Sequence, residues 1–302
     1  MIRVRIPATT ANMGPGFDCI GMALSLYNNL TVDTPEQSER LVIINNNPAI
    51  RIPLNESNLI YKSIKRFYNE TGAPGSVPPL RLIQEDRIPL TRGLGSSAAC
   101  VVGGLLAANE LSGMRLTKND LCYLAAKIEG HPDNSTPALI GGIVVGALSE
   151  KRLDYIKIDP GDKIKFAVMI PDFRLATSVA RGVLPQSVPL SDAVFNVSRA
   201  ALMAAAFTTG DFSLLSSATE DRLHQPYRLP LVPEMDKIFY AAKSRGASGV
   251  FLSGAGPSII AMYEDGAEDF TGRMEAYLKK ERRKWRLTTL APDADGAVIT
   301  IV

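Results

Sequence analysis

Two glycines and two hydroxyl groups directly before an apolar run form the segment of this sequence with the clearest chemical potential. The segment Pro89–Ala99 is Pro-Leu-Thr-Arg-Gly-Leu-Gly-Ser-Ser-Ala-Ala, and small apolar residues continue to Leu111. This run predicts a helix over Ser96–Leu111 that is buried on most sides. The first amides of a helix have no backbone partner and lie at the positive end of its dipole, so they bind anions such as phosphate. Gly93 and Gly95 would allow the backbone to approach such an anion closely.

Taken alone, this segment leaves several interpretations open. The Walker pattern G-x-x-x-x-G-K-[ST] is absent, because no Gly-Lys dipeptide occurs in the chain. A Rossmann dinucleotide fingerprint fits formally at Gly93–Ala98, but a connection containing Pro89 separates the glycines from the preceding strand, and the surrounding order is not repeated β-α-β. A glycine turn capped by serine, with no ligand at all, also explains the segment.

Two more glycine-containing turns occur far from this segment. Pro7–Asp18 leads out of the first predicted strand and contains Asn12 and Asp18, which are polar groups able to bind a substrate. Phe251–Ser258 leads out of another predicted strand. The residues of interest in the latter turn are Ser253, Gly254 and Gly256.

The composition excludes several classes of protein. The 33 Lys and Arg residues against 31 Asp and Glu give a net charge of +2, which offers no basic field for nucleic acid or a membrane surface. Three cysteines without a C-x-x-C pair argue against a disulfide framework and favour a reducing, cytoplasmic setting. The two histidines, His131 and His224, lie far apart, so no zinc-type cluster can form and any metal would have oxygen ligands. No segment is apolar enough to span a membrane.

Hydrophobic periodicity predicts the elements that position these turns. A chain of 302 residues corresponds to about two domains at roughly 100–200 residues each, and we place a boundary near residues 150–165. Asn58–Thr71 is expected to be a helix that ends at Gly72, and Thr117 with Asp120 forms a capping-box-like start for the next helix after Ser96–Leu111. The predicted strands are 2–6, 30–34, 41–46, 80–84, 143–148, 155–158, 165–170, 249–252, 259–263 and 297–302, and the further helices are 191–208, 232–245 and 266–283.

The three turns, in this order and at these separations, closely resemble the three motifs of the GHMP kinase superfamily. Within that superfamily, four further features resemble the homoserine kinase family. They are the T-x-A-N-x-G-x-G-F-D opening, Glu129 followed by His131-Pro-Asp-Asn134, Thr177-x-x-x-Arg181 and Gln225-Pro-Tyr-Arg228. The resemblance extends from Arg3 to about Ser258 and, in length, over the whole chain.

The resemblance implies an α+β fold of two domains. The N-terminal ATP-binding domain, 1–160, would be a mixed α/β domain similar to domain 2 of ribosomal protein S5. The C-terminal domain, 161–302, would be a ferredoxin-like α/β sandwich, consistent with a strand, strand, helix, strand order near the chain's end. The active site would lie in the cleft between them.

The resemblance also implies ATP and Mg²⁺ as cofactors. The nucleotide-binding residues would be Asn58, Pro89, Arg92, Gly93, Leu94, Gly95, Ser96, Ser97, Ala98 and Ala99, with the third motif at Ser253, Gly254 and Gly256. Glu129 and a loop serine, Ser96 or Ser97, would hold Mg²⁺, which prefers hard oxygen ligands and bridges phosphates. Asn58 would contact adenine, although an N-terminal helix cap explains it equally well.

The implied substrate is L-homoserine, phosphorylated on its hydroxyl to O-phospho-L-homoserine in threonine biosynthesis. Arg181 and Arg228 occupy the carboxylate-binding positions, where guanidinium forks suit a planar carboxylate. The ammonium and hydroxyl ends would meet Asn12, Asp18, His131 and Asn134. A homodimer is a reasonable expectation from the family.

The residue at the end of the Glu129 loop indicates catalysis without a strong base. Other superfamily members have an aspartate where this chain has Asn134, and an amide cannot accept the alcohol proton. Catalysis by Asn134, Asp18 and Glu129 would then rest on alignment and on stabilisation of a loose transition state, with Asp133 and Asp18 as alternative bases.

Three other functions remain open on the sequence. The first is another small-molecule kinase of the superfamily, acting on mevalonate or a sugar-like alcohol. The second is a nucleotide-binding sensor without catalysis, against which Glu129 and both loop serines argue. The third is the Rossmann oxidoreductase.

Overall fold

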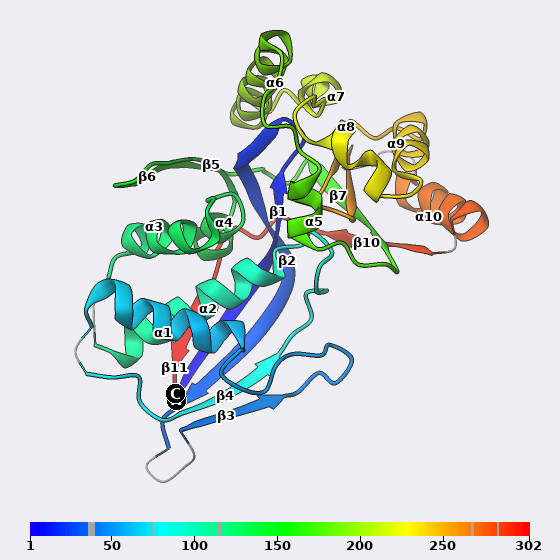
Figure 1. Ribbon diagram of the computed structural model, residues 1–302. Helices are drawn as coiled ribbons and strands as arrows, with labels where there is room; N and C mark the ends of the chain where they lie inside the picture. The colour runs from blue at the N-terminus through cyan, green and yellow to red at the C-terminus, as the bar shows by residue number, and fades with distance from the viewer. Residues whose placement is uncertain (36–39, 74, 114–115, 267–268, 283) are drawn as a thin grey trace.

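The protein, described here by a computed structural model, contains two β-sheets with helices packed on them (Figure 1). The structure describes residues 1–302 except 36–39, 74, 114–115, 267–268 and 283. Among these residues, no helix combines the length and the apolar character needed to cross a membrane. The α+β fold expected from the resemblance is confirmed, since helices pack on both sheets.

The larger sheet has seven strands. Its order is β11-β1-β2-β4-β3, and β5 pairs with β2 and β6 with β5. Ile2, Val4 and Ile6 are buried while Arg3 and Arg5 are exposed, as the alternation in the sequence predicts. The strands are β1 (Ile2–Asn12), β2 (Gly16–Asp33), β3 (Leu41–Asn45), β4 (Leu80–Glu85), β5 (Ile143–Leu148), β6 (Leu153–Ile158) and β11 (Val298–Ile301).

Helices on this sheet begin and end where the sequence indicates. The Asn58 side chain caps α1, and Gly72 ends that helix in a left-handed conformation with φ of 63°. Thr117 and Asp120 form the predicted capping box of α3. In Figure 1 these helices lie over one face of the sheet, with α2 between α1 and the strands. The helices are α1 (Leu59–Thr71), α2 (Ser96–Leu111), α3 (Lys118–Glu129) and α4 (Ser135–Ile140).

The second sheet has four antiparallel strands in the order β10-β7-β9-β8. Its two faces have different partners, because Ala167 and Met169 of β7 pack with α9 and α10 whereas Phe166 and Val168 join the core of the larger sheet. The two sheets therefore share one continuous apolar interface. The strands are β7 (Ile164–Pro171), β8 (Gly249–Leu252), β9 (Ile259–Glu264) and β10 (Trp285–Leu290), and the main helices are α9 (Met235–Ser244) and α10 (Phe270–Glu281).

One long helix, α6, and several short helical elements connect β7 to α9. Of these elements, α6 was predicted from its alanine-rich sequence. They are α5 (Thr177–Gly182), α6 (Leu190–Thr209), α7 (Leu215–Ala218) and α8 (Gln225–Arg228), with 3₁₀ turns at Phe212–Leu214 and Leu229–Leu231.

One sequence prediction is wrong about the end of the chain. Residues 298–301 form a strand, but they pair antiparallel with β1 in the larger sheet rather than completing the ferredoxin-like sandwich. The strand that completes the sandwich is β10, which the sequence analysis did not predict. The division of the chain at 160/161 stays a prediction, with β11 as a segment that returns to the first sheet.

Close packing of α1 on α2 generates a stability prediction. A Cβ at Gly104 would lie 2.7 Å from Ser63 Cβ and 2.8 Å from the Ile60 carbonyl oxygen, whereas one at Gly103 would meet the flexible end of Ile6 at 3.2 Å. Overpacking costs about 1–3 kcal/mol and alanine gains about 1 kcal/mol over glycine inside a helix. We expect Gly104→Ala to lower the free energy of unfolding by up to about 2 kcal/mol.

The matched control is Gly103→Ala, which should leave stability unchanged or raise it. Thermal unfolding followed by circular dichroism measures both variants. Equal midpoints for the two would contradict a helix crossing that requires glycine at position 104.

Candidate active site

The three glycine-containing turns meet in space, as their resemblance to a common motif set implies. The Thr9 amide donates to the Leu94 carbonyl at 3.2 Å, so the end of β1 is bonded to the loop before α2. From the third turn, the Ser253 hydroxyl donates to the Gly93 carbonyl at 2.6 Å. Segments nearly 250 positions apart in the chain therefore form one backbone-bonded cluster.

Gly93 and Gly95 are required by both conformation and space. They have φ of 72° and 69°, in the left-handed region that residues with a Cβ seldom adopt. A Cβ at Gly93 would lie 2.2 Å from the Ser253 carbonyl oxygen, and one at Gly95 would lie 1.9 Å from Thr9 Oγ1. The loop can only lie this close to its neighbours because both positions are glycine.

The start of α2 offers unused backbone donors to this loop. Gly95 is the N-cap and supplies no side-chain cap, and the first turn contains no acidic residue. The helix is sixteen residues long and buried, so its first amides and its dipole face the loop in a low-dielectric setting. This arrangement suits a phosphate group.

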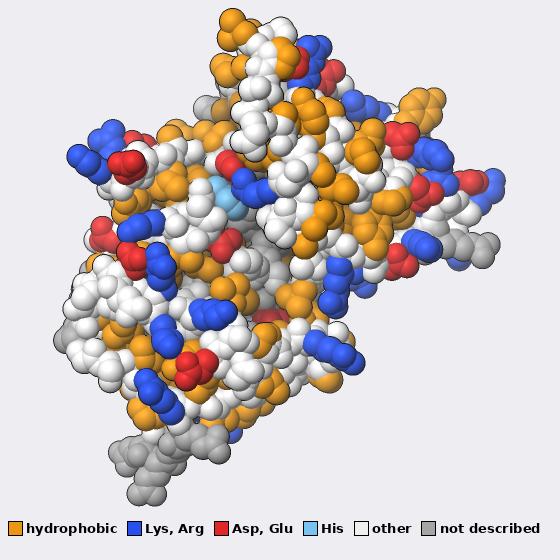
Figure 2. Space-filling view, viewed as in Figure 1, with side chains coloured by type: hydrophobic (Ala, Val, Ile, Leu, Met, Phe, Trp, Pro, Cys, Tyr) orange, Lys and Arg blue, Asp and Glu red, His pale blue; other side chains and the backbone are white. Residues whose placement is uncertain are grey.

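A cavity of about 610 Å³ opens in front of this loop. Figure 2 shows a hollow between the two halves of the molecule, with acidic, basic and histidine side chains around it. Most of the predicted site residues line the cavity: Asn12, Asp18, Asn58, Pro89, Arg92, Gly93, Leu94, Gly95, Ser96, Ser97, Ala98, Glu129, His131, Asn134, Arg181, Arg228 and Gly254.

Three predicted residues do not line it. Ala99 lies within the first turn of α2, where its amide donates to the Gly95 carbonyl. Ser253 and Gly256 pack behind the loop, against Gly93. These three residues support the glycine loop through its backbone.

The Glu129 carboxylate lies beside a loop hydroxyl. Ser97 Oγ donates to Glu129 Oε1 at 2.9 Å, which distinguishes Ser97 from its neighbour Ser96. Burial raises the pKa of Glu129, and the bond from Ser97 and the charge of His131 partly offset that effect. A half-buried carboxylate and a hydroxyl at this distance are a donor set that fits Mg²⁺.

Asp18 and Arg181 form a bidentate ion pair across the cavity. Arg181 Nη2 donates to Asp18 Oδ1 at 2.6 Å and Nη1 donates to Oδ2 at 3.0 Å. Both side chains are about one-third exposed, so they remain accessible from the cavity. The bond from Asp18, together with that residue's charge, raises the pKa of Arg181.

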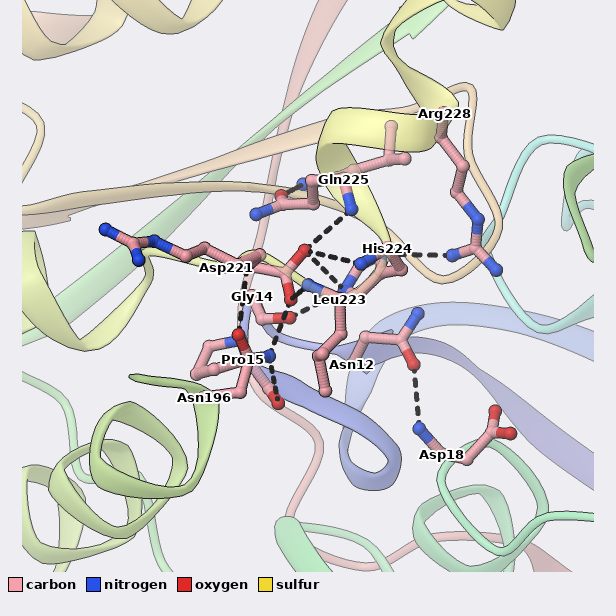
Figure 3. A network of polar contacts seen from close by, with 12 residues as sticks. Asn12, Gly14, Pro15, Asp18, Asn196, Asp221, Leu223, His224, Gln225 and Arg228 are labelled. Atoms are coloured by element: carbon pink, nitrogen blue, oxygen red, sulfur yellow. Dashed lines mark hydrogen bonds and ion pairs between the residues drawn. The ribbon is translucent and has the colours of Figure 1, made fainter. Parts of the chain in front are cut away.

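Arg228 is buried and held in one orientation. Its Nε donates to the Ala180 carbonyl at 3.1 Å, and its Nη1 donates to the Gly254 carbonyl at 3.0 Å and to His224 Nδ1 at 3.1 Å (Figure 3). Burial, followed by the charge of Arg181, lowers the pKa of Arg228 to about 10, so the guanidinium is charged at neutral pH. Arg228 and Arg181 line the same cavity.

The histidine behind Arg228 has a defined tautomer. Because a guanidinium only donates, His224 Nδ1 must accept, and the proton is on Nε2, which donates to the Gly14 carbonyl at 2.6 Å. The His224 side chain is completely buried. Its imidazole is therefore neutral and links Arg228 to the first glycine turn.

A buried carboxylate fixes the chain around this histidine. Asp221 accepts from the amides of Leu223, His224 and Gln225 at 3.0, 3.0 and 2.6 Å, and from Asn196 Nδ2 of α6 at 2.7 Å (Figure 3). Four donors compensate the buried charge. The start of α8, and with it Arg228, is thereby held in position.

Phe17 lies beside both arginines. The Arg181 and Arg228 guanidinium carbons are each 5.5 Å from the centre of its ring, and the ring is 5.4 Å from that of His224. A cation–π contact stabilises a guanidinium while leaving its donors free for an anion. The aromatic residue of the first motif thus supports the pair of arginines.

A chain of hydrogen bonds fixes Asn134. Thr9 Oγ1 donates to Asn134 Oδ1 at 2.8 Å, and Asn134 Nδ2 donates to Asp133 Oδ1 at 3.2 Å. Asp133 is also bonded to His131 Nδ1. Burial alone would lower the pKa of His131, but Asp133 and the charge of Asp18 raise it overall.

Three of these groups form an acceptor-rich point. Ligand atoms of Asp18, His131 and Asp133 all lie within 4.8 Å of one another. The two carboxylates attract a cation, and an ammonium group is one that can donate to their oxygens.

The predicted helix cap at Asn58 is confirmed. Its Oδ1 accepts from the amides of Ile60 and Tyr61 at 2.9 and 3.4 Å, and its Nδ2 donates to the Pro53 carbonyl and to Gln84 Oε1. All polar positions of the amide are thereby used. The adenine contact stays a prediction.

Comparison with known proteins shows the family to which the chain belongs. The family model "GHMP kinases N terminal domain" matches residues 58–142, and "GHMP kinases C terminal" matches residues 203–280. The homoserine kinase of Caldicellulosiruptor saccharolyticus is 48% identical over 301 residues, covering 99% of this chain and 96% of that protein. The chain belongs to the homoserine kinase family of the GHMP kinases.

Solved structures agree with membership of the homoserine kinase family. The homoserine kinase of Cytophaga hutchinsonii has a TM-score of 0.85 at 28% identity over 99% of this chain and 97% of that one. A mevalonate kinase of L. major has a TM-score of 0.69 at 18% identity over 95% of each chain, which shows a shared fold only. The Rossmann alternative is wrong, because the glycine loop lies in a GHMP kinase fold.

Several residues of this homoserine kinase family site were not predicted as functional from the sequence. Thr9 and Phe17 lie inside the quoted first motif, where their neighbours Asn12 and Asp18 drew attention by chemical type. His224 received no role from the sequence beyond its exclusion as a zinc ligand, and only its bond to Arg228 indicates what it does. The nearby Asp221 offered no signal beyond its position before a helix start.

His224 generates a pH prediction. Burial, followed by the nearby charge of Arg228, lowers its pKa in the folded protein. Below its ordinary pKa of about 6.5, the unfolded chain binds a proton that the folded protein does not, so falling pH favours unfolding. We expect the fall in melting temperature between pH 7.5 and 5.5 to be smaller in His224→Asn and His224→Gln than in the wild type.

The two variants separate titration from bonding. Asn retains an acceptor near Nδ1 for Arg228, while Gln places a donor near Nε2 for Gly14, and neither titrates. Differential scanning fluorimetry across the pH range measures the slopes. A slope as steep as the wild-type one in both variants would contradict a neutral His224.

Proposed function

We propose that this chain transfers the γ-phosphoryl group of ATP to the side-chain hydroxyl of L-homoserine, giving O-phospho-L-homoserine for threonine biosynthesis. The observation that supports this most is the set of opposite charges beside the glycine loop: Asp18 with His131 and Asp133 on one side, and Arg181 with Arg228 on the other. An α-amino acid carries the complementary pair of charges.

In the proposed complex the substrate replaces the ion pair between Asp18 and Arg181. The substrate's ammonium would bind Asp18 and the neighbouring acceptors, with Asn12 keeping Asp18 in place through the bond from the Asp18 amide to Asn12 Oδ1 at 3.1 Å. The carboxylate would bind Arg181 and Arg228. Each protein charge thus exchanges one partner for another, so a zwitterion binds without leaving a charge uncompensated.

At the other end of the cavity, the α2 amides and the loop from Gly93 to Ser97 would hold the triphosphate. Glu129 and Ser97 would hold Mg²⁺, which when bound bridges phosphate oxygens and offsets the charge that develops on them. Ser97 is preferred over Ser96 because its hydroxyl contacts Glu129.

The transfer forms a bond between the substrate's hydroxyl oxygen and the γ-phosphorus as the bond to the β-phosphate bridging oxygen breaks. The hydroxyl proton would pass to an oxygen of the transferred phosphoryl group, because Asp133 is engaged by His131 and Asn134 and, in the complex, Asp18 would be paired with the substrate's ammonium. We therefore assign Asn134 to alignment, since its Nδ2 donates to Asp133 and Thr9 fixes its Oδ1. A loose transition state needs little basic assistance, so alignment and charge stabilisation suffice.

We also propose a cytoplasmic setting, as the cysteine content of the sequence indicates, and a homodimer, as the family resemblance implies. All three cysteines have pKa values raised by burial, so none is an activated thiol.

A panel of alcohols tests the substrate. ADP release with MgATP is measured for L-homoserine, 4-hydroxybutyrate, mevalonate and galactose. We expect kcat/KM for 4-hydroxybutyrate to be about 100-fold lower than for homoserine, because the loss of a charge-assisted contact costs about 1.5–3 kcal/mol and Asp18 loses its partner.

The other outcomes identify the alternatives. Turnover of mevalonate or galactose as fast as that of homoserine would assign the chain to another GHMP activity. ADP binding with no alcohol-dependent ADP release at all would indicate a nucleotide sensor.

Three variants test the assigned roles. Glu129→Gln should raise the Mg²⁺ concentration needed for half-maximal activity at least about tenfold, since a charged ligand becomes neutral. Asn134→Ala and Asp18→Ala should lower kcat/KM for homoserine while ATP affinity stays within about twofold. Steady-state kinetics and isothermal titration with an ATP analogue measure these effects.

The control for these variants is Glu110→Gln, which removes an exposed carboxylate from the far end of α2. It should behave as the wild type. An equal loss of ATP affinity in all three site variants would contradict the division of roles.

A further inference from the structure

A second cavity, of about 630 Å³, lies where the loop before α2 meets the ends of β7 and β10. It shares Pro89, Leu90 and Arg92 with the cavity of the active site, and otherwise has its own walls. The lining residues on which the argument depends are Arg87, Asp172, Arg174, Lys284, Trp285 and Arg286.

The charges around this cavity are unbalanced. Five of its lining residues are cationic and one, Asp172, is acidic, although the whole chain is almost neutral. Arg87 is paired with Glu85. Within the part of the chain that the structure describes, the other four cations form no ion pair: Arg92, Arg174, Lys284 and Arg286.

Arg92 lies at the centre of this imbalance. Its Nε donates to the Pro171 carbonyl at 3.0 Å and its Nη2 donates to the Asp172 carbonyl at 2.7 Å, so its bonds go to neutral acceptors. Its Nη1 is buried and, among the described residues, has no partner. Burial lowers the pKa of Arg92, and the charges of Arg174 and Arg286 lower it further.

Arg174, Lys284 and Arg286 are exposed, so water screens their mutual repulsion, but a group of like charges still attracts an anion. Guanidinium groups bind oxyanions through paired donors, while lysine adds a point charge. Four unpaired cations around one cavity exceed what a single carboxylate would balance. Trp285, which also lines the cavity, is buried.

We propose that this second cavity binds a small oxyanion with two or more negative charges, of the phosphate monoester class. Arg174, Arg286 and Lys284 would contact the anion, and Arg92 would supply charge from behind. This site shares Pro89, Leu90 and Arg92 with the cavity of the active site, but the residues that would contact the anion line only the second cavity.

Arg92 also links this site to the glycine loop. It directly precedes Gly93, and its carbonyl accepts from the Ser258 amide at 3.3 Å, so one residue joins β7, the loop and the third motif. An anion that offsets the charge of Arg92 would stabilise this junction. Binding should therefore be visible as an increase in thermal stability.

Inorganic phosphate at pH 8, where it is a dianion, is a suitable probe. The melting temperature is measured against phosphate concentration at constant ionic strength, with and without saturating AMP-PNP and Mg²⁺ to fill the nucleotide site. The wild type should show a saturable rise in both conditions. In the double variant Arg174→Gln/Arg286→Gln, the half-saturating concentration should increase at least about fivefold, with the single variants intermediate.

The control double variant is Arg3→Gln/Lys151→Gln, which removes two exposed positive charges that do not line the cavity. It should respond as the wild type. An equal phosphate response in both double variants would overturn the site, and a malonate response as strong as that to phosphate would overturn its assignment to phosphate chemistry.

The outcome is independent of the proposed kinase reaction, because the measurement needs no homoserine and no turnover. Both double variants should retain the wild-type kcat for the alcohol substrate. If the chain turned over no homoserine, the phosphate response would still stand or fall on Arg174 and Arg286.

Discussion

The close approach of three backbone turns is the constraint on which the site depends. Gly93 and Gly95 lie so near to Ser253 and Thr9 that no side chain fits between them. Since these contacts join the first strand, the start of α2 and the end of β8, the anion-binding amides have a fixed relation to the carboxylates of the first turn. The proposed reaction needs this rigidity, because a phosphoryl transfer without a strong base would depend on the alignment of its reactants.

Behind the reacting groups lies a layer of buried polar residues that sets their orientation. Asp221 fixes the start of α8, His224 accepts from Arg228, and Thr9 fixes the amide of Asn134. Each is satisfied by donors or acceptors from elements distant in sequence. Their burial is stabilising only as a complete network, because a partly satisfied polar core costs free energy.

Much of the fold could be predicted from the sequence because its signals are local. The cap at Asn58, the capping box at Thr117 and the glycine stop at Gly72 each mark a boundary within a few residues. The site residues were predicted because they lie in motifs with recognisable spacing. Sheet membership of 298–301 could not be inferred, since a strand's partner depends on long-range packing that the local alternation does not encode.

The roles of His224 and Arg92 were also beyond local reasoning. An isolated histidine offers no indication of its tautomer until a partner that can only donate, here Arg228, is found beside it. Arg92 follows the pattern of a nucleotide loop, yet its guanidinium donates to carbonyls at the end of β7. In both cases the decisive neighbour comes from another element of the structure.

The pairing of β11 with β1 has a consequence for how the protein is made. One edge of β1 has no partner until residues 298–301 emerge from the ribosome, after the rest of both sheets has been synthesised. An unpaired strand edge is prone to pair with another chain. Until residues 298–301 are made, this edge of the first strand is therefore open to pairing with other chains.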